Sequence, residues 1–454
     1  MATTGTARTR GAPPAAPAPG PPAGPPARLR FGYASGSLVT ATFTTLPGLL
    51  LLPYLTDTLG VGAALAGLVV FVPKAWDALL NPLVGRASDR TRTRWGARRP
   101  YVLWGGLAMA AAFALTFAGP LPGTAGAWFT AAGYLLTATA FAFFQVPYVA
   151  MPAELATRDE DRMRLVGGRV AVIGLAALVT GAAAPALIDA GGGGLAGHRW
   201  AGVFGAVVIA LGAVWVFAGT SGSVPPARVR AADSEPGLRR QFAAARANPS
   251  FAALLWCAVV QSAATGVLLA GAPYFADHVL RDSASGVGPL VVAFVAPNLL
   301  TVPLWSRLRG RRGHALASAL FAAGCLLLLA APVLPDPAVL AAMALAGTGH
   351  AGQLLFLYAM LAQCTARTER RRAGVLSGLF TTGEGLGVAA GPFAYGLVLQ
   401  LSGYVSSGTG RAAEQTATAE LGLLAGFAAL PALATVAAVA LLRGYDRPPA
   451  PTDP

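Results

Sequence analysis

The sequence predicts an all-α membrane protein whose twelve transmembrane helices form two pseudo-symmetric six-helix bundles. Three observations predict this class. The 454 residues are 55% hydrophobic and 11% charged, whereas a soluble domain carries charge on about a quarter of its positions. Apolar windows of roughly 20 residues, the length of a helix that crosses a ~30 Å hydrocarbon core, recur along the chain. A sequence pattern in the first half also recurs in the second half.

The apolar windows justify the individual helices. They run from about residue 31 to about residue 442 and number twelve. Their approximate centres lie near Pro47, Pro73, Met109, Ala138, Leu178, Ile209, Ala263, Val295, Leu326, Leu345, Gly387 and Ala432. Cys257, Cys325 and Cys364 fall within or beside these windows, without the paired spacing of a metal or disulfide site. We therefore expect them to be small core residues.

The distribution of charge predicts the topology. The formal net charge is +14, and arginines cluster in the N-terminal tail and in alternate connections between spans. The other connections hold only Arg199, Arg281 and Arg411. This alternation follows the positive-inside rule and predicts a multi-pass protein of the plasma membrane with both termini in the cytoplasm. Because the basic runs lie on alternate loops rather than on one folded surface, nucleic acid is not an expected partner.

An internal repeat relates the two halves. "PYLTD" at 53–57 ends the first span, and "PYFAD" at 273–277 ends the seventh. Asp77 and Asn298 each follow these segments and each stand five residues before a proline. Six spans, a linker and six spans with parallel repeats is the layout of the major facilitator fold, whose substrate site lies near the midplane between the halves.

The same reasoning predicts the domain boundaries. We expect a disordered cytoplasmic tail at 1–30, an N-terminal six-helix bundle at 31–219, a cytoplasmic linker at 220–250, a C-terminal six-helix bundle at 251–443 and a cytoplasmic tail at 444–454. The tail and the linker are rich in Ala, Pro, Gly and Arg, and the N-terminal tail lacks the apolar region of a signal peptide.

The loop after the second span, "GRASDRTRTRWGARRP" at 85–100, combines glycine, acid and arginine. Its candidate gating residues are Gly85, Asp89, Arg90, Arg98 and Arg99. Such a turn can bridge helix ends by charge-assisted hydrogen bonds and latch one state of a rocking transporter. The alternative is that its arginines serve only to retain the loop in the cytoplasm. Glu154 ends the fourth span, where we expect it near Arg162 and Arg164, either as a gating ion pair or as an interfacial charge.

Several segments carry a family resemblance. "KAWDALLNPLVGRASDRTRTRWGARRPYVLWG" at 74–105, with "PYLTDTLG" before it and "FQVPYVAMPAEL" at 144–155 after it, resembles the glycoside-pentoside-hexuronide:cation symporters, the group of the melibiose permease. The resemblance extends through "RRRAGVLSGLFTTGEGLGVAAGPFAYGLVLQLSGY" at 370–404, so it covers both halves. It implies the major facilitator fold and uptake of a glycoside driven by a cation gradient.

Lys74, the only lysine of the chain, lies within the second span. Placing an ionised side chain at mid-bilayer costs roughly 2.5–3.5 kcal/mol, so Lys74 and Asp77 should face the bundle interior. Lys74, Asp77 and Asn81 are spaced i, i+3 and i+7, which puts them on one helix face. The resemblance makes Asp77 the cation-site carboxylate, with Lys74 as its basic neighbour, and the alternative is a static ion pair that fixes helix packing.

Departures from the family pattern bear on the ion and the substrate. Sodium-using permeases of this group usually place a second acid where this chain has Asn81, so we favour a proton over sodium as the coupling ion. The acid that the melibiose permease uses for sugar in span one is replaced by a neutral residue near Ala41. Gln145 stands where that permease has another sugar-binding acid. A specific galactoside is therefore not implied.

Other polar and aromatic residues within the spans are candidates for substrate contact. The candidate substrate-binding residues are Gln145, Tyr148, Trp76, His350, Gln353 and Glu384. Each has a structural alternative. Glu384 lies in a glycine-rich segment that can serve helix packing, a lone intramembrane histidine is often a hydrogen-bonded packing residue, and aromatic side chains near helix ends often anchor the interface.

These observations favour a secondary active transporter that moves a sugar or glycoside by alternating access. The alternative within the same fold is a proton-driven exporter of a drug-like or hydrophobic metabolite. The sequence shows no HExxH, no GxSxG and no conspicuous nucleophile beside a base, so we do not expect an enzyme. Single buried charges in paired halves also disfavour a channel. We expect no cofactor and no bound metal other than a possible Na⁺ at Asp77, a coupling ion that is H⁺ or Na⁺, and a monomer whose partners are the substrate and the lipid bilayer.

Overall fold

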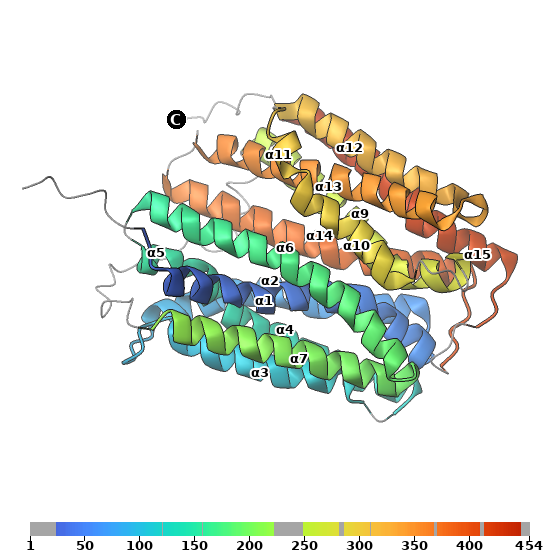
Figure 1. Ribbon diagram of the computed structural model, residues 1–454, viewed down its shortest axis with the longest axis horizontal. Helices are drawn as coiled ribbons and strands as arrows, with labels where there is room; N and C mark the ends of the chain where they lie inside the picture. Colours follow the sequence, from blue (N-terminus) through green and yellow to red (C-terminus); the bar gives the residue numbers. More distant parts are fainter. Residues whose placement is uncertain are drawn as a thin grey trace, which may run out of the picture.

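The computed structural model describes residues 24–119, 121–156, 158–221, 248–280, 286–308, 310–366, 370–408 and 413–445. Every regular element in these ranges is helical, and the long helices run side by side (Figure 1). Most of the predicted tails and of the predicted linker, together with Arg281 and Arg411, falls outside the described residues.

The helices form two successive groups. The first comprises α1 (Ala27–Pro53), α2 (Ala63–Arg90), α3 (Arg99–Phe117), α4 (Gly123–Ala150), α5 (Pro152–Leu155), α6 (Asp159–Ala190) and α7 (Gly194–Gly219). The second comprises α9 (Pro249–Phe275), α10 (Val287–Leu300), α11 (Val302–Trp305), α12 (Gly310–Leu327), α13 (Asp336–Ala366), α14 (Arg370–Leu401), α15 (Ala417–Leu424) and α16 (Leu430–Leu441). The two groups lie on opposite sides of the molecule in Figure 1, and α2 and α14 meet where the groups touch.

Each predicted span centre lies within a helix. Ten helical segments of the described residues are long and apolar enough to cross a membrane. The span predicted around Val295 is shorter than expected, because α10 ends at Leu300 after 14 residues. Pro303 explains the break, since proline has no N–H to donate and its ring clashes with the carbonyl four residues earlier.

The sequence repeat has the same backbone form in both halves. Helices α1 and α9 are each 27 residues long. Each continues into a five-residue π-helical turn, Tyr54–Thr58 in the first half and Ala276–Leu280 in the second.

The start of α9 has a clear local cause. Asn248 accepts a hydrogen bond from the backbone N–H of Phe251 at 3.1 Å, and Pro249 occupies the first helical position.

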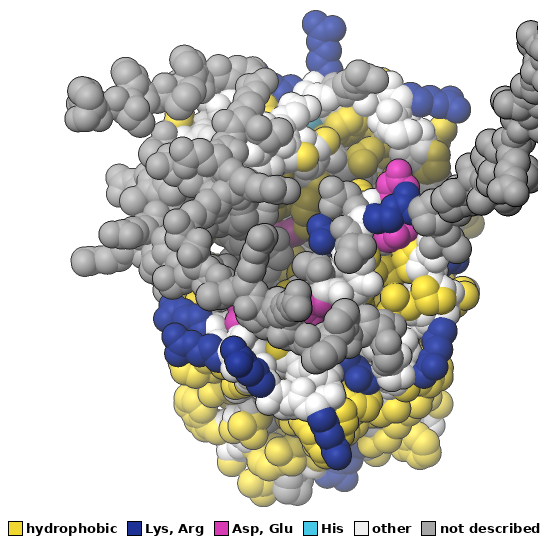
Figure 2. Space-filling view, turned by 90° about the vertical axis from the view of Figure 1, so that its left-hand side faces the viewer, with side chains coloured by type: hydrophobic (Ala, Val, Ile, Leu, Met, Phe, Trp, Pro, Cys, Tyr) yellow, Lys and Arg dark blue, Asp and Glu magenta, His cyan; other side chains and the backbone are white. Residues whose placement is uncertain are grey.

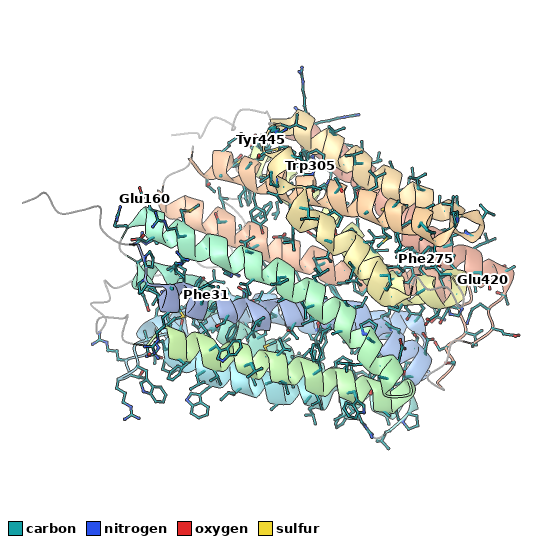
Figure 3. The ribbon with its side chains drawn as sticks, viewed as in Figure 1. Phe31, Glu160, Phe275, Trp305, Glu420 and Tyr445 are labelled. Carbon is teal, nitrogen blue, oxygen red and sulfur yellow. The ribbon has the colours of Figure 1, made fainter. Side chains whose placement is uncertain are left out.

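Basic side chains lie around one end of the molecule. Phe31, Glu160 and Tyr445 lie at one end, and Phe275 and Glu420 lie at the other (Figure 3). The first end is called the arginine end below, because Lys and Arg side chains are spread around it (Figure 2). The opposite end is called the far end. This division matches the alternation of charge that the sequence predicts.

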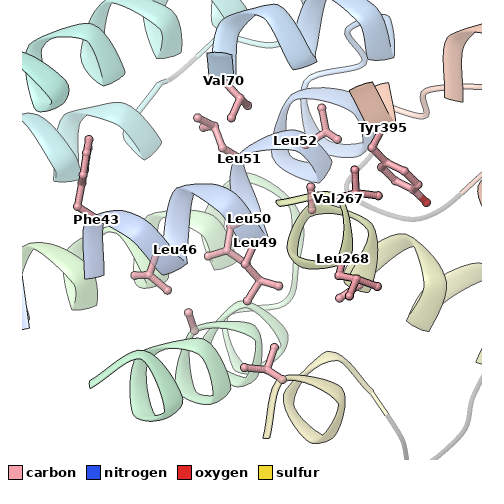
Figure 4. Packing of buried hydrophobic residues seen from close by; sticks show 14 of the residues in the cluster. Phe43, Leu46, Leu49, Leu50, Leu51, Leu52, Val70, Val267, Leu268 and Tyr395 are labelled. Atoms are coloured by element: carbon pink, nitrogen blue, oxygen red, sulfur yellow. The ribbon is translucent and has the colours of Figure 1, made fainter. Parts of the chain in front are cut away.

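Helices α1 and α9 pack against each other across the boundary between the groups. Leu49 to Leu52 of α1 are buried, and Val267 and Leu268 of α9 belong to the same cluster (Figure 4). Helices α9 and α14 also pack closely, because Gly266 has no side chain. A Cβ on Gly266 would lie only 2.2 Å from a backbone oxygen of α14. Cys257, Cys325 and Cys364 are buried, which confirms their prediction as core residues.

Candidate functional site

Lys74 and Asp77 lie on α2, near its middle, as the sequence predicts. The Lys74 ammonium is 3.3 Å from the centre of the Phe43 ring of α1 and donates to the Phe43 carbonyl at 3.4 Å. It is also 5.6 Å from the centre of the Phe141 ring. Both residues of the expected ion pair are described, and no N–O contact within 4.0 Å joins Lys74 to Asp77. A cation–π contact therefore holds the ammonium in place of a direct salt bridge.

Asp77 and Asn81 present two unpaired oxygens on adjacent turns of α2. Asp77 Oδ1 and Asn81 Oδ1 are buried, and neither accepts a hydrogen bond from a described residue. Buried polar atoms in proteins usually have a partner. Two oxygens one helical turn apart, without donors, can accept a proton or coordinate a small cation. Asn298, the counterpart of Asp77 in the repeat, also has a buried Oδ1 that accepts from no described residue.

The polar residues of α1 and α4 meet beside this site. Thr40 Oγ1 donates to Gln145 Oε1 at 2.7 Å. This contact joins Gln145 to one of the threonines near Ala41. Tyr148 is fully buried, stacks on Tyr33 at 4.9 Å and donates to the Tyr33 carbonyl at 2.8 Å. Its ring is thus packed inside the N-terminal helices in this conformation. Trp76 is 42% exposed and donates to Thr139 at 3.1 Å.

Glu384 of α14 is held by a residue of α13. Tyr358 donates its hydroxyl to Glu384 Oε2 at 2.6 Å, and the tyrosine is 46% exposed. The guanidinium of Arg169, on α6, is 5.4 Å from the centre of the Tyr148 ring. Arg169 is not among the predicted site residues. An arginine inside an apolar stretch is the same signal that singled out Lys74, so it could have been found.

His350 and Gln353 enter hydrogen bonds inside the C-terminal helices. His350 Nδ1 lies 3.3 Å from Thr265 Oγ1, and the His350 ring stacks on Phe294 at 5.4 Å. Gln353 is 1% exposed and donates to Ser318 at 3.4 Å, while its Oε1 has no partner among the described residues. The two side chains thus belong to the packed interior of α9, α12 and α13 in this conformation.

Arg98 joins three helix ends at the arginine end. Its Nη2 is 3.2 Å from Asp89 Oδ1 at the end of α2, and its Nε is 3.2 Å from Glu154 Oε1 of α5. It also donates to the carbonyl of Ala150, the last residue of α4. Burial raises the pKa of Glu154 above its ordinary value, although Arg98 lowers it. This bridge lies wholly within the N-terminal helices.

The other predicted loop residues have separate roles. Arg99 is buried, stacks on Phe217 of α7 at 4.3 Å and donates to its carbonyl at 2.5 Å, so it ties α3 to α7. Arg90 is exposed at the end of α2, and the Gly85 carbonyl accepts from Ser88 at 3.0 Å. The ion-pair partner of Glu154 is Arg98, which lies 56 residues earlier in the chain. Arg162, which the sequence places near Glu154, donates to the carbonyl of Ala156 at 2.9 Å.

We expect Arg98→Gln to slow transport about tenfold while substrate binding stays near normal. The change leaves Asp89 and Glu154 without their shared cation, so the helix ends lose their bridge. The Glu154 pair should carry most of the effect, because Asp89 is 40% exposed and exposed pairs contribute about 0–1 kcal/mol. Initial uptake rates in cells would measure this, with the exposed Arg92→Gln as the matched control. Wild-type rates in Arg98→Gln would show that the bridge plays no part in gating.

A second polar cluster closes the far end between the two groups. Tyr404 donates its hydroxyl to Asp57 Oδ1 at 2.8 Å and lies 3.1 Å from His278 Nε2. Since the hydroxyl has one proton, His278 Nε2 is the donor in its contact with Tyr404. Thr56 and Tyr274 share a hydrogen bond of 2.7 Å. These contacts join the π-helical turns of both repeats.

Two serines strengthen this closure. Ser407 donates to the Asp57 carbonyl at 2.8 Å, and Ser406 donates to the Val61 carbonyl at 2.9 Å. Phe71 of α2 also stacks on Phe393 of α14 at 5.9 Å. This cluster is not among the predicted site residues, although Thr56 and Asp57 lie within the repeated segment "PYLTD".

Comparison with known proteins agrees with this architecture. A bacterial homolog to the human lysosomal transporter Spinster, in an inward-facing and unoccupied conformation, superposes with a TM-score of 0.63, covering 92% of this chain and 93% of that chain at 15% identity. At this identity the likeness shows the fold alone, which is the major facilitator fold that the sequence predicts.

Sequence comparison reaches further. The chain is 30% identical over 182 residues to the putative glycoside/cation symporter YagG of Escherichia coli (strain K12), covering 40% of this chain and 39% of that protein. It is 24% identical over 388 residues to the glucuronide carrier protein homolog of the same strain, covering 83% and 84%. The family described as MFS/sugar transport protein matches residues 32–446. This multi-pass membrane protein therefore belongs to the MFS/sugar transport family, in agreement with its resemblance to the glycoside-pentoside-hexuronide:cation symporters.

Proposed function

We propose that this chain is a cation-coupled symporter that carries a sugar or glycoside across the plasma membrane by alternating access. The observation that carries the proposal is the pair of unpaired, buried oxygens of Asp77 and Asn81 on α2. Two relatives support it, because their names are a glycoside/cation symporter and a glucuronide carrier homolog. A transporter of this kind releases its substrate unchanged, so no enzymatic residue is required.

The coupling ion in this proposal is a proton. One carboxylate suffices to bind a proton, whereas sodium favours several oxygen ligands. Here Asp77 supplies the single acid, and Asn81 adds one neutral oxygen. A proton on Asp77 neutralises a charge that would otherwise be buried during the movement of the carrier. The experiment below distinguishes this proton coupling from coupling by sodium bound between Asp77 and Asn81.

The proposed substrate site lies between the halves. Thr40 and Gln145 supply a hydroxyl and an amide from the N-terminal helices, and Tyr358 and Glu384 supply a hydroxyl and a carboxylate from the C-terminal helices. Trp76 is a further candidate. Such groups match the alternating donors and acceptors of a sugar. In this proposal the arginine end faces the cytoplasm, the far end is the closed outer gate, and the protein acts as a monomer.

Purified protein in liposomes tests the proposed function. Radiolabelled glycosides would be offered under an imposed proton gradient and, separately, under an imposed sodium gradient. Accumulation above the external concentration with the proton gradient alone supports the proposal. Accumulation with the sodium gradient alone would show that the coupling ion is sodium and that the protein is still a symporter. Binding or extrusion of lipophilic compounds, without glycoside uptake under either gradient, would favour a proton-driven exporter and reject the proposal.

We expect Glu384→Gln to be produced at the normal level but to transport at least tenfold more slowly or with a shifted pH profile. The amide keeps the size of the side chain but removes its charge, and a hydrogen bond to a charged group contributes about 1.5–3 kcal/mol. Uptake rates over a pH series would measure the change. Tyr358→Phe is the comparison variant, because it removes the hydroxyl that donates to Glu384 and leaves the carboxylate, so it separates the loss of the hydrogen bond from the loss of the charge. An unchanged rate and pH profile would exclude Glu384 from the mechanism.

A further inference from the structure

A small cavity opens at the arginine end of the C-terminal helices, apart from the site described above. Its volume is about 380 Å³. It lies between the start of α12 and the end of α16, and its lining residues are Arg311, Arg312, His314, Ala315, Val439 and Leu442. Three of these six residues, Arg311, Arg312 and His314, have basic side chains. The first turn of α12 contains no acidic residue.

The chemistry of this cavity favours a negative ligand. Arg311 and Arg312 are exposed and occupy the first turn of the 18-residue helix α12. The first N–H groups of a helix lack partners inside the helix, and the helix dipole adds a partial positive charge there. Guanidinium groups bind phosphate oxygens in a bidentate geometry. Arginines beside a helix N-terminus therefore form the donor set that phosphate groups use in other proteins.

His314 supplies an independent observation. The residue is 1% exposed, and its Nδ1 has no hydrogen-bond partner among the described residues. Its Nε2 lies 3.1 Å from Gln261 Oε1, while the amide nitrogen of Gln261 donates to Ser318 at 3.0 Å. Since the Gln261 oxygen can only accept, His314 Nε2 carries a proton and donates it. Nδ1 is thus an unprotonated acceptor that has no donor among the described residues.

We propose that this cavity binds a phosphate group. The two guanidinium groups and the helix N-terminus neutralise the anion. His314 Nδ1 accepts from the P–OH group of inorganic phosphate, and a phosphodiester headgroup, which has no P–OH group, is held by the two guanidinium groups. The phosphate can come from a phospholipid headgroup or from a free phosphate, because α12 begins at the charged end of a membrane-spanning segment. This binding site is independent of the proposed transport function.

The position of the cavity gives the ligand a route to the transport machinery. From His314, hydrogen bonds run through Gln261 to Ser318, and Gln353 of α13 donates to the same Ser318 hydroxyl. All four side chains are buried. A phosphate in the cavity would therefore lie at one end of a chain of hydrogen bonds that reaches Gln353, a candidate substrate-binding residue.

The test uses the full-length protein, purified in detergent, and follows its thermal unfolding midpoint. One arm titrates inorganic phosphate at constant ionic strength. The other adds mixed micelles of anionic phosphatidylglycerol or of zwitterionic phosphatidylcholine. Arg311→Gln/Arg312→Gln removes the two charges, and Arg92→Gln/Arg94→Gln is the matched control because it removes two exposed arginines from another loop of the same end. Ala315→Glu is a second variant, since it places a carboxylate at an exposed lining position.

We expect phosphate or phosphatidylglycerol to raise the midpoint of the wild type and of the Arg92/Arg94 control. Arg311→Gln/Arg312→Gln and Ala315→Glu should bind the same probe at least tenfold more weakly. A response to inorganic phosphate identifies a soluble ligand, and a response to phosphatidylglycerol alone identifies a lipid headgroup. The proposal is overturned if neither probe raises the wild-type midpoint. Equal responses in the wild type and in both cavity variants would overturn it as well.

Discussion

Asp77→Asn is expected to abolish accumulation of substrate against its gradient, so that the ratio of internal to external concentration falls to about 1. Exchange of internal for external substrate should persist within a few-fold of the wild type. Asparagine keeps the size of the side chain but cannot take up a proton. Exchange does not require the empty carrier to return across the membrane, which is the step that a buried charge would hinder. Counterflow and gradient-driven uptake in the same liposomes would separate the two activities.

The surroundings of the Asp77 carboxylate support this prediction. Asp77 Oδ1 is buried without a donor, and the Lys74 ammonium lies on the Phe43 ring rather than within 4.0 Å of the carboxylate. A cation that binds Asp77 therefore has no salt bridge to displace. Asp189→Asn is the control, since this acid is exposed at the end of α6. Continued accumulation by Asp77→Asn would show that Asp77 is not the coupling site and that its role is structural.

Tyr404→Phe is expected to shift the protein towards a state that is open at the far end. The tyrosine hydroxyl donates to Asp57 from the N-terminal helices and contacts His278 from the C-terminal helices. A hydrogen bond to a charged group contributes about 1.5–3 kcal/mol, so its loss should change the ratio of closed to open states by about 10-fold to 150-fold. Spin labels at Leu121 and Glu414, one on each half at the far end, would report the new distance distribution.

Tyr395→Phe is the matched control for this closure. Tyr395 packs on Tyr274 in the same aromatic group, but its hydroxyl contacts the Leu423 carbonyl at 3.4 Å within the C-terminal half. The control should therefore leave the distance distribution unchanged. If Tyr404→Phe and Tyr395→Phe give the same distribution as the wild type, the polar cluster does not hold the far end closed. The stacked and apolar contacts between α2 and α14 would then suffice.

Local properties of the sequence determined the fold class. Hydrophobicity and length predicted twelve helices, and each predicted centre lies in one. The repeat of "PYLTD" and "PYFAD" predicted two related halves, and both segments end a 27-residue helix in a π-helical turn. Helical periodicity placed Asp77 and Asn81 on one face. These predictions succeed because transfer to lipid and helix geometry depend on residues that are near one another in the chain.

The tertiary structure alone decided which side chains meet. Lys74 stands three residues before Asp77 in the sequence, yet its ammonium contacts Phe43, 31 residues earlier. Arg98 binds Glu154, and Tyr404 binds Asp57 across 347 residues. Periodicity assigns a residue to a helix face but does not say which helix covers that face or which rotamer its side chain adopts. Those outcomes depend on the packing of all the helices together, because close packing leaves each long polar side chain only the space that its neighbours from distant segments allow.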